Sequence, residues 1–260
     1  RTLYVCGMKE VRTLQVGRWG HHVEELVGKN DWAGALDIFL AVRRGTFPPL
    51  LDFPHPLAAR VRAVDSRTTQ VIQSYLVSRL KPDVPRVEAR RMCTMAISIC
   101  IEMCLWSVLY KTVFECFKAS GHVAVYCNTL EPFIVGGRIP RGQMDSEVLC
   151  SILQSYALPL EEEGRMAVQL AQQDDRPLFV DCDHCPRLFP TALRLQQLVL
   201  YVDITQLDLN LAIRLFTQHR LWTALIHVYC ALGDYTSPLE LLVGECAQLA
   251  KQVLNAEPQE

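Results

Sequence analysis

The strongest constraint on the fold is a series of apolar stripes at helical spacing in residues 199–243. Residues three and four positions apart lie on the same face of an α-helix, and three such faces follow one another in this stretch. The joints at 203–208, 219–220 and 233–238 are so short that they can only reverse the chain between antiparallel helices. Because each helix has one apolar face that a neighbour must cover, the pattern predicts an all-α protein, an irregular α-solenoid of antiparallel helix pairs.

Composition and charge narrow the classes of function. The chain has 260 residues, half of them hydrophobic, which is enough to bury a large core. A formal net charge of -2 gives no overall attraction to polyanions, so we expect no nucleic-acid partner. The eleven cysteines are odd in number and scattered through helical patterns, as at Cys93, Cys100 and Cys116. This distribution is typical of reduced cysteines and predicts an intracellular protein.

Residues 1–16 differ from the rest of the chain, because two β-prone runs lie on either side of residues 7–10. An isolated two-stranded hairpin is only marginally stable in water, so we expect these terminal strands to complete a sheet whose other strands lie outside this chain. No secretory signal opens the sequence, and Arg1 in place of an initiator Met predicts a fragment of a longer protein.

Residues 17–260 are predicted to form one continuous solenoid with two interruptions. Prolines in residues 45–56 forbid a helix and predict a joint, and residues 174–190 are predicted to be an insertion loop. The expected helices are 19–27, 31–43, 57–80, 86–118, 121–135, 145–156, 160–173, 190–202, 208–219, 220–232 and 237–254. Their predicted N-caps include Asp31, Asp145, Asp208 and Ser237, with Gly45 after the second helix and Pro238 in the first turn of the last.

Residues 92–110 are close to the length and apolarity that a bilayer demands, and Arg90, Arg91 and Lys111 flank them as interfacial anchors would. Glu102 opposes insertion, because a carboxylate in the middle of a bilayer costs on the order of 2.5–3.5 kcal/mol. The helices on both sides are amphipathic. We therefore favour a central solenoid helix buried on both sides, with a membrane span as the alternative.

One pair of cysteines has a spacing suited to metal binding. Cys182 and Cys185, with His184 between them, form the CxxC motif of the predicted insertion loop. A structural zinc site needs four ligands, and no second pair stands nearby. Redox chemistry would need the motif at a helix N-terminus in a βαβ unit. We treat the pair as a weak candidate metal site, predict no metal or other cofactor, and keep a zinc or thiol module as an alternative function.

The remaining polar clusters do not suggest catalysis. His21 and His22 are adjacent and would point in different directions from a helix, and His219 and His227 are expected at joints or on the surface. Residues 161–163, all Glu, are expected in the solvated first turn of a helix. Arg86, with Arg90 and Arg91, is expected on a solvated helix face, although such a cluster could also bind an acidic partner or anionic lipid. Phosphate loops and serine-hydrolase motifs are absent, so we predict that the protein is not an enzyme.

Several short motifs resemble the family of vacuolar protein sorting-associated protein eight, a subunit of the CORVET endosomal tethering complex. They occur in the family's order in residues 130–140, 202–208, 220–229 and 235–240, and the helix pair that begins at Trp19 resembles the family's junction between β-propeller and solenoid. The matching positions that we expect to have structural roles are Trp19, Leu130, Glu131, Pro132, Asp203, Leu207, Asp208, Leu221, Ala224, Tyr229, Pro238 and Leu239.

The resemblance implies a non-catalytic scaffold in endosomal or vacuolar protein transport, with residues 1–16 as the remnant of a propeller. Its implied partners are the subunits of a class C tethering core and, through the full-length protein, an early-endosomal Rab GTPase. The implied location is cytoplasmic and peripheral on the early endosome membrane, where tethering precedes membrane fusion. A HOPS-type subunit, or a clathrin-like coat or adaptor solenoid, would share this architecture and stays an alternative.

Overall fold

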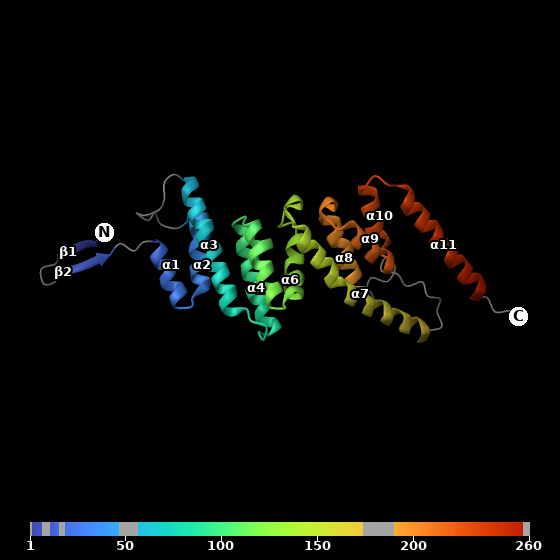
Figure 1. The fold of residues 1–260 in the computed structure, drawn as a ribbon, viewed down its shortest axis with the longest axis horizontal. Helices are drawn as coiled ribbons and strands as arrows, with labels where there is room; N and C mark the ends of the chain where they lie inside the picture. Colours follow the sequence, from blue (N-terminus) through green and yellow to red (C-terminus); the bar gives the residue numbers. More distant parts are fainter. Residues whose placement is uncertain (1, 7–10, 16–18, 47–56, 174–189, 257–260) are drawn as a thin grey trace. The chain divides into compact units, whose positions relative to one another are not determined.

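The computed structural model describes residues 2–6, 11–15, 19–46, 57–173 and 190–256. The chain forms two compact units, Arg1–His122 and Val123–Glu260. Within each unit most of the described residues are helical (Figure 1). The protein is therefore an all-α, solenoid-like chain, as the apolar stripes predict. Its division into a terminal sheet, a proline-rich joint and an insertion loop stays a prediction, because residues 47–56 and 174–189 lie outside the described residues.

Two short strands precede the helices. Strand β1, Thr2–Cys6, pairs antiparallel with β2, Val11–Gln15, and the register places Thr2 opposite Gln15 and Cys6 opposite Val11. In the described residues these strands pair with each other in a two-stranded sheet. Their origin in a β-propeller stays a prediction.

The first unit stacks its helices in chain order. They are α1 (Trp19–Gly28), α2 (Trp32–Arg43), α3 (Leu57–Arg79), α4 (Arg86–Glu102), the π-helix η1 (Val108–Val113) and α5 (Phe114–Ala119). Helix α2 packs against α1, α3 and α4, while η1 and α5 both pack against α3. The Asp31 side chain accepts a 2.9 Å hydrogen bond from the Gly34 amide and caps α2 as predicted. Large side chains such as Phe39, Ile72 and Phe117 are fully buried between the helices.

The predicted helix at 86–118 is wrong, because the chain breaks after Glu102. Cys104 has φ of 56°, the Cys104 amide donates to Ile101 O, and the Leu105 amide donates to Cys100 O. This is a Schellman motif, which ends a helix through one left-handed residue. Glycine usually holds that position, and a cysteine there gave no signal in the sequence. None of the described helices is both long and apolar enough to span a membrane.

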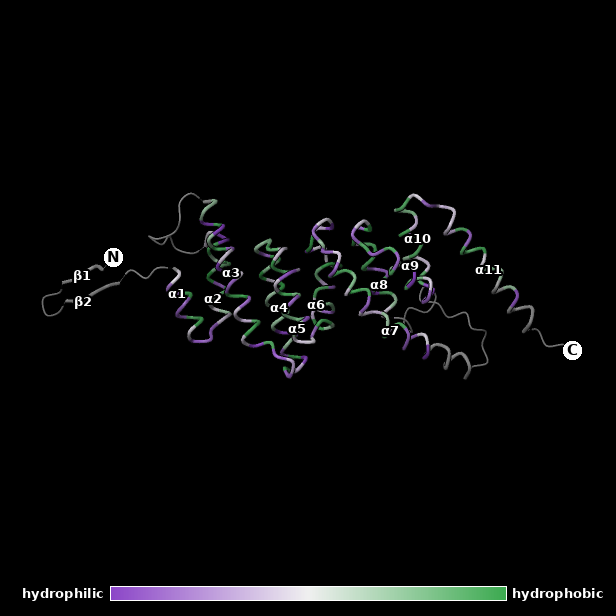
Figure 2. The backbone as a smooth tube through the Cα atoms, viewed as in Figure 1, coloured by the Kyte–Doolittle hydropathy of each residue, from purple (hydrophilic) through white to green (hydrophobic). Residues whose placement is uncertain are grey.

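The second unit repeats the stacking. Its α-helices are α6 (Val123–Val135), α7 (Ser146–Gln173), α8 (Pro190–Tyr201), α9 (Leu209–Gln218), α10 (Trp222–Ala231) and α11 (Thr236–Ala256). Two 3-10 helices, η2 (Arg141–Gln143) and η3 (Ile204–Gln206), lie in its joints. Helix α8 packs against α6, α7 and α10, and α9 packs against α7 as well as α10, so these helices contact more than their sequence neighbours. Figure 2 shows hydrophobic and hydrophilic stretches alternating along these helices.

One predicted helix boundary and one predicted cap in this unit are wrong. Helices 145–156 and 160–173 are one continuous helix, α7, with Pro159 inside it. Proline removes one backbone donor, and the helix continues because Tyr156, Leu160 and Glu163 are all buried against neighbours. Ser237 is not the cap of α11: the Asp234 carboxylate accepts hydrogen bonds from the amides of Thr236 and Ser237. Asp145 and Asp208 do cap α7 and α9 as predicted.

Candidate functional site

The most distinctive polar cluster of the second unit centres on Glu131 in α6. Its side chain is only 6% exposed, and its two oxygens accept hydrogen bonds from one guanidinium, that of Arg194 in α8. The distances are 3.0 Å from Nε to Oε1 and 2.6 Å from Nη2 to Oε2. Such a two-point, charge-assisted pair fixes orientation as well as distance. The pair therefore holds α6 and α8 in one relative position.

A third helix contributes Tyr156 to this cluster. Burial, followed by the interaction with Glu131, raises the pKa of Tyr156, so its phenol stays neutral. The hydrogen bond to Glu131 also raises the pKa of Arg194, which keeps its charge. The cluster is thus a neutral phenol and a fixed ion pair. Its arrangement suits a structural role.

A second carboxylate joins α7 to α8. Glu163 is 6% exposed; its Oε1 accepts from the Thr191 amide at 2.8 Å, and its Oε2 accepts from the Ala192 amide at 3.3 Å. These amides belong to the first turn of α8, where backbone donors lack partners within the helix. The prediction that Glu163 lies in a solvated first turn of its own helix is therefore wrong. Glu163 caps another helix, and only the tertiary structure brings the two together.

The positions predicted from the motif resemblance mostly lie in joints and at helix contacts. Asp203 accepts from the Thr205 amide at 3.0 Å and begins η3, and Asp208 accepts from the Leu211 amide at 3.1 Å. Leu130, Leu207, Leu221, Ala224 and Pro238 are buried, and Tyr229 is half-buried. Pro132 lies inside α6. Leu239 is 62% exposed. Trp19 begins α1, and its side chain lies outside the described residues.

The candidate metal ligands cannot be placed, because Cys182, His184 and Cys185 lie outside the described residues. Among residues that the structure does describe, no group of three His, Cys, Asp or Glu side chains could hold a metal ion. Burial raises the pKa of Cys100 and of Cys127 to about 12, so both thiols stay protonated. Burial also lowers the pKa of His219, while Glu161 acts in the opposite direction. These groups suit packing and not nucleophilic chemistry.

Comparison with known proteins gives the same picture as the motifs. Residues 190–260, which contain α8 to α11, match the family model described as "Vps8 central TPR". Over 252 residues the chain is 19% identical to the human protein named "Vacuolar protein sorting-associated protein 8 homolog". Over these residues the chain is similar to Vps8 proteins. The alignment covers 92% of this chain and 15% of the human protein, so the chain spans a small part of that relative. No solved structure matches the chain.

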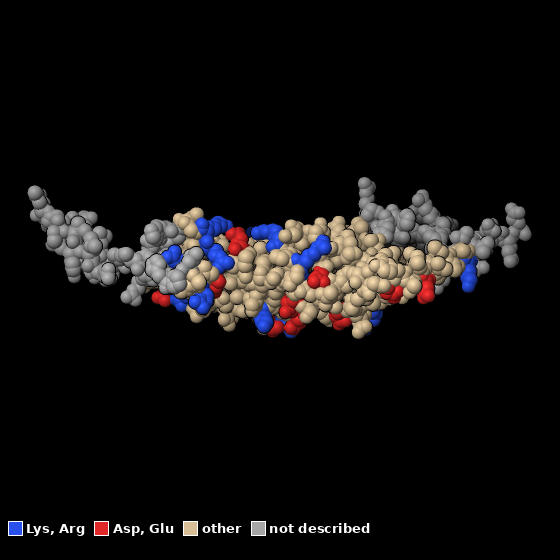
Figure 3. Space-filling model, turned by 90° about the horizontal axis from the view of Figure 1, so that it is seen from above, with Lys and Arg blue, Asp and Glu red and all other residues tan. Residues whose placement is uncertain are grey.

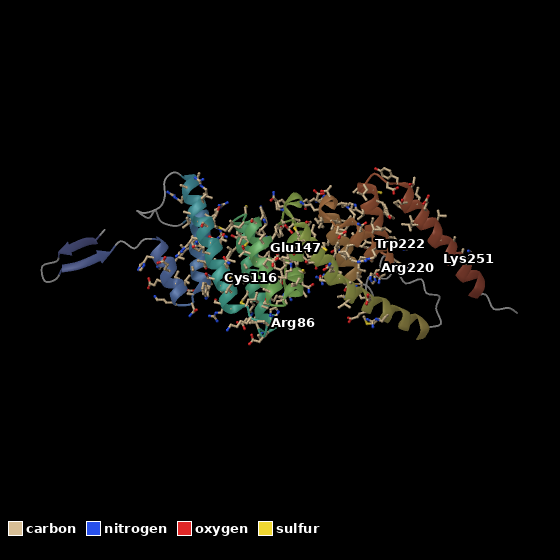
Figure 4. The ribbon with its side chains drawn as sticks, in the orientation of Figure 1. Arg86, Cys116, Glu147, Arg220, Trp222 and Lys251 are labelled. Atoms are coloured by element: carbon tan, nitrogen blue, oxygen red, sulfur yellow. The ribbon has the colours of Figure 1, made fainter. Side chains whose placement is uncertain are left out.

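The residues that match the Vps8 central TPR also take part in the polar contacts described above. Arg194, the amides capped by Glu163, and the joints at Asp203 and Asp208 all lie within residues 190–260. At the joint between α9 and α10, Arg220 has φ of 55°, and both Arg220 and Trp222 are labelled in Figure 4.

Sequence reasoning found the caps and buried apolar positions. It missed Arg194, Tyr156 and the role of Glu163, which have no local signature.

Proposed function

We propose that this chain is part of a non-catalytic scaffold subunit of a multi-subunit vesicle-tethering complex in endosomal and vacuolar protein sorting. The observation that carries the proposal is the match of α8 to α11 to the Vps8 central TPR. The chain spans 15% of its human relative. The activity of the whole protein is therefore a proposal.

The packing supports a scaffold. In each unit, helices contact neighbours beyond their sequence partners, and in the second unit the Glu131–Arg194 pair and the Glu163 cap connect three helices. Stacked helices of this kind provide a long surface and transmit position along it. Figure 3 shows acidic and basic side chains interspersed on the face that it draws. Such a mixed surface suits protein partners better than a polyanion.

The finer form of the proposal is a CORVET-like subunit. Its partners would be the subunits of a class C tethering core and, through the full-length protein, an early-endosomal Rab GTPase. It would act in the cytoplasm, peripherally on the early endosome membrane, before membrane fusion. The support for this form is the resemblance of the motifs in residues 130–140 and 199–243 together with the similarity to Vps8.

The test is affinity purification of the tagged full-length protein from its own cells, followed by mass spectrometry. We expect the class C core subunits to co-purify in near-stoichiometric amounts. A matched variant with Arg194→Glu, which places two carboxylates against each other between α6 and α8, should lower this recovery. Recovery of clathrin-type coat components without the tethering core would overturn the tethering proposal. Subunits specific to HOPS would overturn its CORVET-like form.

A further inference from the structure

The antiparallel order of the second unit gathers three joints at one end of its helices. Helices α6, α8 and α10 run toward this end, and α7, α9 and α11 begin there (Figure 1). The Gln206 side chain donates from Nε2 to the Gly142 carbonyl oxygen at 3.3 Å, which connects the first two joints. Helix α10 packs against α8 and brings the third joint beside the second. We call these three segments the joint edge: residues 136–147, 200–208 and 232–240.

The joint edge exposes large apolar side chains at the ends of three helices. Among the described residues, ten large apolar side chains are exposed, and five of them lie in these short segments. They are Leu200, Tyr201, Leu232, Tyr235 and Leu239. Single exposed apolar residues are ordinary, whereas several at one end of a unit are typical of a surface that a partner covers.

The joint edge is also acidic. Its charged side chains are two arginines and six carboxylates, a net charge of -4: Arg138, Arg141, Asp145, Glu147, Asp203, Asp208, Asp234 and Glu240. The whole chain has a formal charge of only -2, so negative charge is concentrated here. The cause is structural, because each joint begins a helix, and an aspartate caps each of α7, α9 and α11.

The capping aspartates stay ionised at neutral pH. A hydrogen bond from Thr205 lowers the pKa of Asp203. Hydrogen bonds from Ser237 and then Thr236 lower the pKa of Asp234 to about 2. The negative charge of the edge is therefore a lasting property of the folded chain.

Aromatic rings add a second preference for cations. The Arg141 guanidinium already lies over the Tyr201 ring, 6.0 Å from its centre, in a contact between two of the joints. The exposed ring of Tyr235 follows Asp234 in the third joint. This joint thus supplies a π face and a carboxylate, the two groups that bind a Lys or Arg side chain.

We propose that the joint edge binds a short basic segment of a partner protein, in which Lys or Arg side chains flank two or more large apolar residues. The apolar residues of that segment would cover Leu232, Tyr235 and Leu239, and its cations would face the surrounding carboxylates. Nucleic acids and anionic membranes carry the same sign of charge as the edge and are disfavoured. The inference goes beyond the tethering proposal and does not depend on which complex contains the chain.

The test begins with a displayed library of random peptides, selected on the purified chain at physiological salt. We expect enrichment of peptides with several Lys or Arg and at least two large apolar residues. For a labelled synthetic copy of the most enriched peptide, fluorescence anisotropy should show binding weakened by about threefold or more in Leu239→Ala and in Glu240→Lys. Both side chains are exposed, so circular dichroism should show unchanged folding.

Two further measurements separate the contributions of charge and apolar contact. Added salt should weaken binding, because it screens the carboxylates of the edge. Replacing the apolar residues of the peptide by Ser should also weaken binding, which attraction by charge alone would not explain.

Matched controls lie on α7, away from the joint edge. Leu158 is 69% exposed, and Glu162 is an exposed carboxylate of the same helix. They lie roughly 18 and 24 Å along α7 from its first residue, Ser146. Leu158→Ala and Glu162→Lys make the same chemical changes as the edge variants and should leave peptide binding unchanged.

The proposal is overturned if the selection enriches acidic peptides or none, or if the edge variants bind the peptide as well as the α7 variants do. It is also overturned if the chain forms a dimer that Leu239→Ala dissociates, or binds phosphatidylserine vesicles through the same side chains, because another occupant would then cover the edge. None of these results would affect co-purification of the class C core subunits with the full-length protein, so the two proposals fail separately.

Discussion

At the residue scale, several helix ends share one backbone conformation. The chain reverses through single residues in the left-handed region, with positive φ at Gly45, Gly121, Gly137 and Gly233, but also at Asn30, Cys104 and Arg220. A residue with a Cβ atom pays roughly 1–2 kcal/mol for that conformation. A glycine allows such a helix end to be predicted from the sequence, whereas the ends at Cys104 and Arg220 could not be predicted in this way.

We expect Cys104→Gly to raise the free energy of unfolding by about 0.5–1 kcal/mol, because glycine adopts a positive φ without strain. Cys104 is exposed, so its side chain contributes little packing. Urea unfolding followed by circular dichroism measures the change. Cys104→Ala removes the same side chain but keeps the strained Cβ, and should give no gain. Equal effects of the two substitutions would contradict this account.

Asp234 provides a pH test. Hydrogen bonds from Ser237, and then from Thr236, lower the pKa of Asp234 from its ordinary value of 3.8 to about 2. Since the pKa is lower in the folded state, the contribution of this carboxylate is fully present above pH 3.8 and is lost as the pH falls through about 2. Proton–nitrogen spectra should show the amides of Thr236 and Ser237 shifting with that midpoint. Asp234→Asn, which still accepts a hydrogen bond, should abolish the shift; a midpoint near 3.8 in the original chain would contradict the prediction.

At the scale of elements, side chains far apart in sequence decide how helices meet. Glu131 and Arg194 are 63 residues apart, and Glu163 caps an amide 28 residues away. Burying a carboxylate is costly unless strong hydrogen bonds satisfy it, so each contact is specific to one arrangement of α6, α7 and α8. The continuous α7 has the same origin, because burial on both sides of Pro159 outweighs one lost hydrogen bond.

We expect Glu131→Gln to lower the free energy of unfolding by about 1–3 kcal/mol, since it keeps the shape but removes the charge that Arg194 requires. A double-mutant cycle with Arg194→Ala should give a coupling of about 1–2 kcal/mol, reduced from the buried limit because Arg194 is half exposed. The exposed pair Arg67 and Glu24 is the matched control, with an expected coupling of about 0–1 kcal/mol. Equal couplings for the two pairs would refute a special role for Glu131.

At the scale of the whole molecule, the described residues form two compact, mainly helical units. The second unit contains the residues that match the Vps8 central TPR, and the Glu131–Arg194 pair and the Glu163 cap join its helices. This packing fits a scaffold.

The CxxC motif gives a prediction at this scale. A scaffold needs no metal, so we expect the purified chain to hold well under one equivalent of zinc. The double substitution Cys182→Ser and Cys185→Ser should leave thermal unfolding and co-purification of partners unchanged. Atomic emission spectroscopy and the affinity purification described above measure both. One equivalent of zinc that disappears in the double variant would favour the alternative of a zinc module.

The sequence by itself determined the helical class, most helix positions, and the caps at Asp31, Asp145 and Asp208. These features depend on interactions within about one helical turn, which periodicity and local chemistry reveal. Tertiary structure alone decided the end of α4 at Cys104, the continuation of α7 through Pro159, and the partners of Glu131 and Glu163. In these cases packing between distant helices sets the free energy, and no local pattern records which residues will meet.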